Sequence, residues 1–110
     1  MLAGVIIETT NSKEGTLIEV LQRPMARSGR PLETDASEGR FLISSDKFLD
    51  PAVYHPGKRI TVIGVASGSS VRPLGELEYR YPVLSARELK LWEPSAGPWF
   101  SIGIGVYHGY

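Results

Sequence analysis

The stretch Arg59-Ile60-Thr61-Val62-Ile63-Gly64-Val65-Ala66 is the strongest strand signal in the chain and decides its fold class. Apolar residues stand at nearly every position, and most of them are β-branched. This pattern predicts a strand that is buried on both faces or bent around a barrel. Gly64 would allow a tight bend or a bulge within it.

Further strands are predicted on both sides of this stretch. Val5 to Glu8 and Thr16 to Leu21 flank a polar turn and together predict a hairpin. Leu89 and Leu91 alternate with charged residues, and this two-residue period is typical of a strand with one solvent-exposed face. We expect strands near residues 3–9, 15–22, 39–45, 58–67 and 79–92.

The segments between these strands are rich in residues that favour turns and loops. Arg23 to Gly39 predicts a long loop of alternating charge. Phe48 to Tyr54 predicts one short helical turn, with Asp50 as N-cap and Pro51 at the first helical position. Ser67 to Gly75 is rich in Gly, Ser and Pro and predicts a loop.

This order of elements predicts an all-β domain: a small OB-like five-stranded barrel with one short helical turn. A generic β-sandwich and an SH3-like barrel remain alternatives. The strand patterns also predict which side chains form the core. The core candidates are Val5, Ile7, Ile18, Val20, Phe41, Ile43, Ile60, Val62, Leu84, Leu89 and Leu91.

Composition shifts at Pro94, so we expect the barrel domain to cover residues 1–94 and a Gly/aromatic-rich C-terminal segment to cover residues 95–110. Bulky residues alternate with small ones over residues 98–110, as in a strand with one apolar face. Such a segment would add to its own barrel as an extra strand or pair with another subunit or a protein partner.

The composition excludes several function classes. Twelve basic and twelve acidic residues balance, which argues against a nucleic-acid partner. The chain has no cysteine and two isolated histidines, His55 and His108, so neither a metal site nor thiolate catalysis is expected. No motif for a cofactor is present, and we expect none to be bound.

None of the possible catalytic motifs in the chain has the spacing or the setting that its chemistry requires. Ser67 stands one place too late for a nucleophile elbow, and no helix signal follows it. The glycines of residues 103–109 lack a helix that could receive a pyrophosphate. The acidic residues Glu33, Asp35, Glu38, Glu76 and Glu78 fall in polar loops, where a solvated carboxylate is the ordinary state. We therefore expect no catalytic residue and no enzyme activity.

An aromatic face is the remaining candidate site. Tyr79, Tyr81, Trp92 and Trp99 could stack a base or sugar as OB-folds do, with positive charge from arginines such as Arg40. Arg72 and Arg80 could add to that charge. The candidate ligand-binding residues are Arg40, Tyr79, Tyr81 and Trp92.

Several short motifs follow one another in a fixed order along the chain. They are Gly39-Arg40-Phe41, Phe48-Leu49-Asp50-Pro51 with Tyr54 and Gly57, Ile60-Thr61-Val62-Ile63-Gly64, Leu74-Gly75-Glu76, Tyr79-Arg80-Tyr81-Pro82-Val83 and Leu91-Trp92. Taken in order, these motifs resemble the Slp family of Gram-negative outer-membrane lipoproteins, the starvation-inducible type. The resemblance extends over nearly the whole chain and includes the Gly- and aromatic-rich tail.

Two features depart from the family pattern. The family's signal peptide and acylated lipobox cysteine are missing from this chain, which resembles the soluble body without its N-terminal lipid anchor. Glu78 stands where the family often has proline. The resemblance implies a non-enzymatic, lipid-anchored domain of the outer membrane, facing the periplasm or the cell surface, with a structural or protein-interaction role in starvation or stress. An OB-type module that binds an oligosaccharide or similar ligand on the aromatic face is the alternative.

Overall fold

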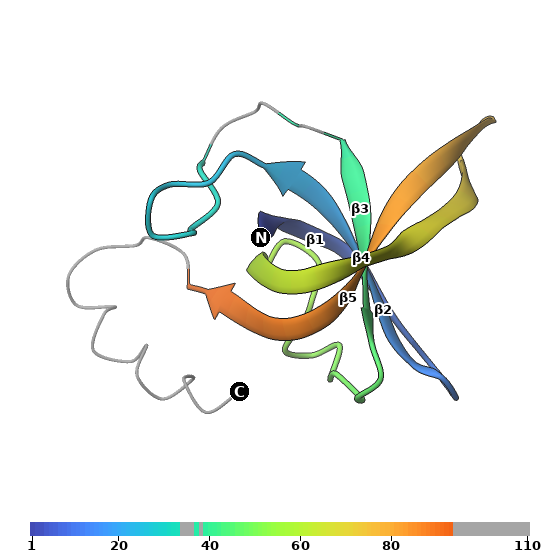
Figure 1. Ribbon diagram of the computed structural model, residues 1–110, viewed down its shortest axis with the longest axis horizontal. Helices are drawn as coiled ribbons and strands as arrows, with labels where there is room; N and C mark the ends of the chain where they lie inside the picture. Colours follow the sequence, from blue (N-terminus) through green and yellow to red (C-terminus); the bar gives the residue numbers. More distant parts are fainter. Residues whose placement is uncertain (34–36, 38, 94–110) are drawn as a thin grey trace.

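The computed structural model describes residues 1–33, 37 and 39–93, and these form a closed five-stranded barrel (Figure 1). The strands follow one another around it in the order β1-β2-β3-β5-β4, with β3 and β5 parallel and every other neighbouring pair antiparallel. This arrangement confirms the expected all-β, OB-like barrel. The strands are β1 (Leu2–Ser12), β2 (Gly15–Arg23), β3 (Arg40–Ser45), β4 (Arg59–Leu74) and β5 (Leu77–Trp92).

β4 closes the barrel because it bends, as its sequence predicted. Its first residues pair with β1, whereas its whole length pairs with β5. The register shifts at Ile63/Gly64 and again at Ala66/Gly68, and such bulges increase the local bend and twist. A Cβ atom on Gly64 would lie only 2.5 Å from the carbonyl oxygen of Ser85, so the strands approach closely where β4 bends.

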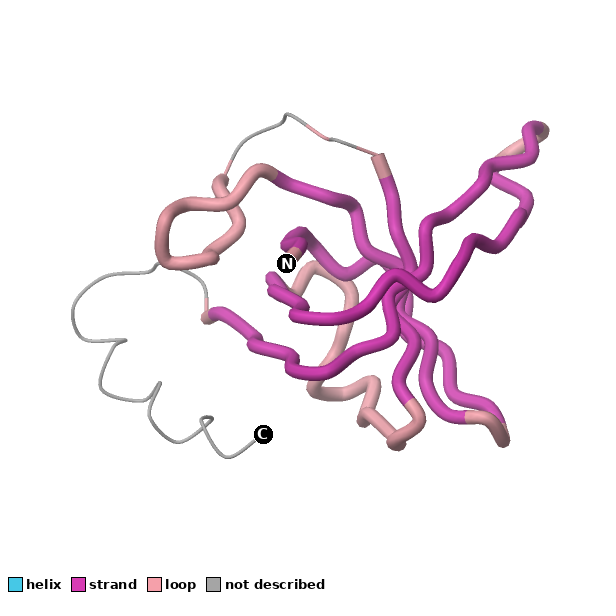
Figure 2. Tube along the Cα trace, viewed as in Figure 1, coloured by secondary structure: helices cyan, strands magenta, loops and turns pink. Residues whose placement is uncertain are grey.

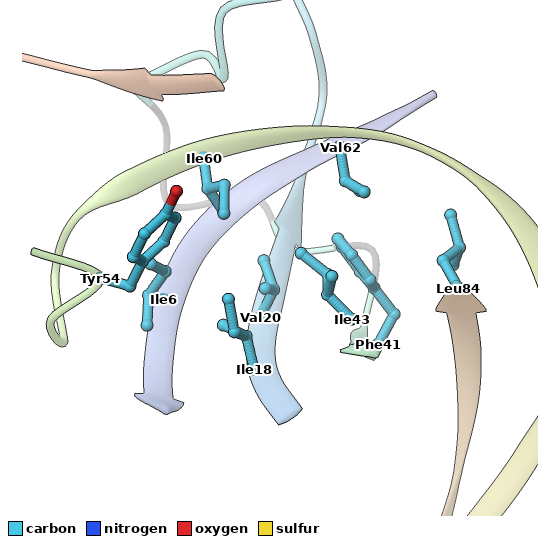
Figure 3. Packing of buried hydrophobic residues seen from close by; sticks show 9 residues of the cluster. All are labelled: Ile6, Ile18, Val20, Phe41, Ile43, Tyr54, Ile60, Val62 and Leu84. Carbon is cyan, nitrogen blue, oxygen red and sulfur yellow. The ribbon is translucent and has the colours of Figure 1, made fainter. Parts of the chain in front are cut away.

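The core fills the barrel interior, and Figure 3 shows its side chains converging there. Seven of the core candidates are buried: Ile18, Val20, Phe41, Ile43, Ile60, Val62 and Leu84. Leu89 and Leu91 pack against this cluster and are partly buried.

In β1 the core prediction was wrong by one residue. Ile6 is the buried side chain, and Val5 and Ile7 are only partly buried. Ile6 pairs with the buried Val20, which places both on the inner face, and the register shifts just after it. An almost uninterrupted apolar run does not show which alternate residues face inward.

The predicted helical turn is present as a single turn. The carbonyl oxygen of Asp50 accepts a hydrogen bond from the backbone nitrogen of Tyr54 at 2.9 Å, and Oδ1 of Asp50 caps the turn by accepting from the nitrogen of Ala52 at 2.9 Å. The turn carries Tyr54 into the core, where Figure 3 shows its ring beside Ile6. The described residues form no helix, and so none that is long and apolar enough to cross a membrane.

The prediction of a loop over Ser67 to Gly75 was wrong. β4 runs on to Leu74 and β5 starts at Leu77, with Gly75 at φ 65° as the first residue of a two-residue turn, the position that favours glycine in hairpins. The residues that suggested a loop have roles within the hairpin: Gly68 lies at a bulge. Pro73 is tolerated because, among the described residues, no strand pairs with the other edge of β4 at that point.

The resulting hairpin (residues 67–82, here called the projecting hairpin) extends well beyond the rest of the barrel (Figures 1 and 2). Among the described residues, its two strands pair only with each other. β1 pairs with β4 no further than Val62, and β3 pairs with β5 only from Val83 to Ser85.

The first part of the predicted long loop lies within the described residues. Residues 24–33, called the flap, fold back on themselves through a bridge between Met25 and Pro31. The backbone nitrogen of Ala26 donates to the carbonyl oxygen of Arg30 at 2.9 Å. The expected C-terminal segment, residues 95–110, lies outside the described residues.

Candidate functional site

The structure brings three of the four predicted site residues together and places the fourth elsewhere. Arg40 on β3 and Tyr79 and Tyr81 on β5 meet on the outer face of the barrel, at the base of the projecting hairpin. Trp92 stands at the far end of β5 and contacts the flap residue Arg30.

Glu19 on β2 is the centre of the first group, which we call the hairpin lock. Its Oε2 accepts a hydrogen bond from Nη1 of Arg40 at 2.7 Å and another from the hydroxyl of Tyr81 at 3.2 Å. The alternation of β2 turns Glu19 outward between the buried Ile18 and Val20. One carboxylate therefore joins three strands that lie far apart in the sequence.

Tyr79 completes the hairpin lock from the side of the hairpin. Its hydroxyl accepts a hydrogen bond from the backbone nitrogen of Arg40 at 3.2 Å, and its ring meets that of Tyr81 edge-on with centroids 4.8 Å apart. Gly39 makes this approach possible, because its φ of 101° favours glycine and a Cβ there would lie 2.8 Å from the tyrosine hydroxyl.

The protonation states in the hairpin lock suit these bonds. Burial raises the pKa of Tyr81, and the negative charge of Glu19 raises it further, so the phenol stays neutral and donates. The hydrogen bond to Glu19 raises the pKa of Arg40, which remains a cation, although burial opposes this change. The pair is a charge-assisted hydrogen bond with a neutral phenol beside it.

Burial limits what the hairpin lock can bind. Tyr81 is only 2% exposed, and its ring is covered in this structure instead of presenting a face for stacking. The hydroxyls of both tyrosines are already hydrogen-bonded within the group. What the arrangement can do is fix the base of the projecting hairpin to β2 and β3.

Beyond the hairpin lock, apolar side chains on the projecting hairpin face solvent. Leu77, beside the turn, is 75% exposed, and Val71 is 47% exposed. Arg80 and Ser69 pair across the hairpin through a 3.1 Å hydrogen bond. Leu77 is the most exposed large apolar side chain of the described residues, and Val71 lies on the other face of the hairpin because Leu77 pairs with Leu74.

Trp92 belongs to a second group at the flap. Its Nε1 donates to Oγ1 of Thr61 at 2.9 Å, and that hydroxyl donates to the carbonyl oxygen of Gly29 at 2.6 Å. Nζ of Lys90 lies 4.1 Å from the centroid of the indole ring and Cζ of Arg30 lies 5.4 Å from it, within the range of cation–π contacts.

Among the described residues, the other candidates form no hydrogen bond or ion pair with the hairpin lock. His55 is exposed and lies beside the carbonyl oxygen of Pro56, while His108 and Trp99 lie outside the described residues. Glu33 pairs with Arg59 at 2.7 Å. Within the described ranges, no group of three or more His, Cys, Asp or Glu side chains is placed to hold a metal ion.

Sequence reasoning missed Glu19 and Leu77. A single acidic residue between apolar neighbours on a strand gives no sign of its partners, which come from two distant strands. A signal for Leu77 was present: two leucines flank Gly75-Glu76, which is the pattern of a two-residue hairpin turn.

Comparison with known proteins bears directly on these motifs. The model of the outer membrane lipoprotein Slp family matches residues 1–101. The chain belongs to this family. Family membership confirms the resemblance seen in the sequence and places the protein at the outer membrane. Two motifs that carried the resemblance, one beginning at Gly39 and the other at Tyr79, meet in the hairpin lock.

Three relatives illustrate the similarity. The lipoprotein YeaY of Escherichia coli is 27% identical over 97% of this chain, and an uncharacterized protein of Haemophilus influenzae is 33% identical over 83% of it. The outer membrane protein Slp of Escherichia coli is 25% identical over 81% of it. The matched regions cover 60%, 50% and 47% of these relatives, so the chain spans about half of their length. No solved structure matches the chain significantly.

Proposed function

We propose that this domain is the folded body of a lipid-anchored outer-membrane lipoprotein and that it serves as a protein-contact module without enzymatic activity. The observation that carries the proposal is the projecting hairpin, whose Leu77 is 75% exposed while its base is held by the hairpin lock. A contact element works best when its position is fixed before the partner arrives, because less ordering entropy is then lost on binding.

Family membership supports the outer membrane as the place where this contact role is carried out. The Slp family is an outer-membrane lipoprotein family, and an N-terminal lipid anchor would hold the domain at that membrane. A role in starvation or stress follows from the same resemblance and belongs to the proposal. The C-terminal segment, residues 98–110, is a further proposed contact because of its alternating apolar pattern.

An oligosaccharide-binding module on the aromatic face is the alternative. It has less support in the structure, because Tyr81 is covered and Trp92 stands apart from both tyrosines. A glycan array would favour it if binding were reproducible and were lost on Tyr79→Ala replacement.

The proposal is tested by photocrosslinking in the native cells. A photoreactive amino acid at Leu77 should give a discrete crosslinked band in the outer-membrane fraction, because this side chain faces the partner. Glu14 is the matched control, since it is also exposed beside a hairpin turn, between β1 and β2. Equal crosslinking at Leu77 and Glu14, or none at Leu77, would contradict the proposal.

A further inference from the structure

Charged side chains are divided unevenly between the two ends of the barrel. The end that carries the flap also holds the start of β1, the end of β2, the start of β4 and the end of β5. Six cations and two acids gather there, a net charge of +4 for the described residues. They are Arg23, Arg27, Arg30, Lys58, Arg59 and Lys90, with Glu33 and Glu93.

Both acids at the flap end are already neutralised. Glu93 Oε1 lies 2.9 Å from Nζ of Lys58, and Glu33 Oε1 lies 2.7 Å from Nη2 of Arg59. The other four cations form no ion pair within the part of the chain that the structure describes. Asp35 and Glu38, which follow the flap in sequence, lie outside that part. Among the described residues, an excess of positive charge without an ion pair is therefore concentrated at this end.

Trp92 stands among these cations. It is half-buried, with Lys90 and Arg30 close to its ring, and its Nε1 is fixed on Thr61. Arg27 and Lys90 are exposed. An amphipathic indole beside cations with long apolar stems is the combination found where proteins meet the headgroup region of a bilayer.

The opposite end lacks this excess. Its turn between β1 and β2 and residues 46–50 after β3 carry three acids and two cations, all exposed: Glu14, Asp46 and Asp50 with Lys13 and Lys47. The two ends therefore differ in sign, and an anionic surface would orient the domain with the flap end toward it.

We propose that the flap end docks on a bilayer surface of anionic phospholipid headgroups, with Arg27 and Lys90 facing the phosphates and Trp92 at headgroup level. β1 begins at this end, since Leu2 pairs with Val62. The membrane setting of this contact rests on the proposed function. The projecting hairpin then remains free for a protein.

The test uses the chain without any anchor, so it does not depend on the hairpin contact. Vesicles of phosphatidylglycerol and vesicles of phosphatidylcholine are titrated into the Trp99→Phe variant, in which Trp92 is the remaining tryptophan. We expect a blue shift of Trp92 with phosphatidylglycerol alone, weakened by added salt. Arg27→Gln and Lys90→Gln should each weaken binding about fivefold, whereas Lys13→Gln and Lys47→Gln should leave it unchanged.

Three results would overturn the inference. They are the absence of binding to phosphatidylglycerol at low salt, equal binding to both lipids, and an equal loss in the variants of the opposite end. Each of these leaves the photocrosslinking result at Leu77 unaffected, so failure of the lipid contact is distinguishable from failure of the protein contact.

Discussion

The hydroxyl of Tyr81 on β5 donates to the carboxylate of Glu19 on β2 across 3.2 Å, although 62 residues separate the two in the sequence. Arg40 on β3 donates to the same oxygen. Because β3 lies between β2 and β5 in the barrel, this carboxylate links two strands that are not neighbours. It thereby fixes the position of β5, which forms one strand of the projecting hairpin.

Removing this bridge should destabilise the domain. Glu19→Ala leaves the Tyr81 hydroxyl and the Arg40 guanidinium without their acceptor, and we expect the free energy of unfolding to fall by about 1–3 kcal/mol. Glu14→Ala is the control, since that side chain is exposed beside a turn. Urea denaturation followed by circular dichroism measures both variants. Equal, small losses in the two would show that the hairpin lock contributes little.

Stability should fall at alkaline pH. Burial raises the pKa of Tyr54 and of Tyr81 above the ordinary value near 10. The contribution of these two phenols to the free energy of unfolding is complete below about pH 10. It is lost as the pH rises through their raised pKa values, because the tyrosines of the unfolded chain release their protons at lower pH than those of the folded protein. Each group adds a slope of about 1.4 kcal/mol per pH unit in that range.

The measurement is the free energy of unfolding between about pH 9 and 11 for the wild type and for Tyr54→Phe and Tyr81→Phe. The slope should become shallower in each variant and shallower still in the double variant. An unchanged slope in the double variant would mean that neither buried phenol controls the alkaline loss.

Two adjacent residues of β4 test the barrel interior. Val62 is 0% exposed and Ile63 is 46% exposed, on opposite faces of the strand. Val62→Ala should cost about 1–3 kcal/mol through lost burial and a cavity, whereas Ile63→Ala should cost less than about 1 kcal/mol. Thermal melts of the two variants decide this, and the reverse ranking would contradict the inward orientation of Val62.

The C-terminal segment provides a further prediction from the sequence. Phe100, Ile102, Ile104 and Val106 recur at every second position, so removal of residues 96–110 should lower stability or abolish self-association. Thermal melting, size-exclusion chromatography and amide exchange compare the two forms. If all three are unchanged on truncation, the segment acts only as a tail.

The sequence predicted the barrel because its strands carry strong local signals, above all the apolar run from Ile60 to Val65. It misjudged Ser67 to Gly75, where composition indicated a loop but the ladder between β4 and β5 continues. It also chose the wrong face at Ile6, because a run apolar at nearly every position contains no alternation to read.

For the candidate site, the sequence named Arg40, Tyr79 and Tyr81 as ligand-binding candidates but did not indicate which residue joins them. Their grouping depends on Glu19 and on the room left by Gly39, and both depend on long-range pairing of β2, β3 and β5. Trp92 was assigned to the same face as a member of a set of aromatic residues. Because β5 is long, Trp92 at its end lies beside the flap instead of beside the two tyrosines.

The central claim is that the hairpin lock holds the projecting hairpin in place for a protein partner. It is tested most directly by photocrosslinking from Leu77 in native cells, with and without Glu19→Ala. We predict a discrete crosslinked band from Leu77 that is strongly reduced by Glu19→Ala at equal protein abundance and is not obtained from Glu14. A band that persists unchanged in the Glu19→Ala protein would contradict the claim.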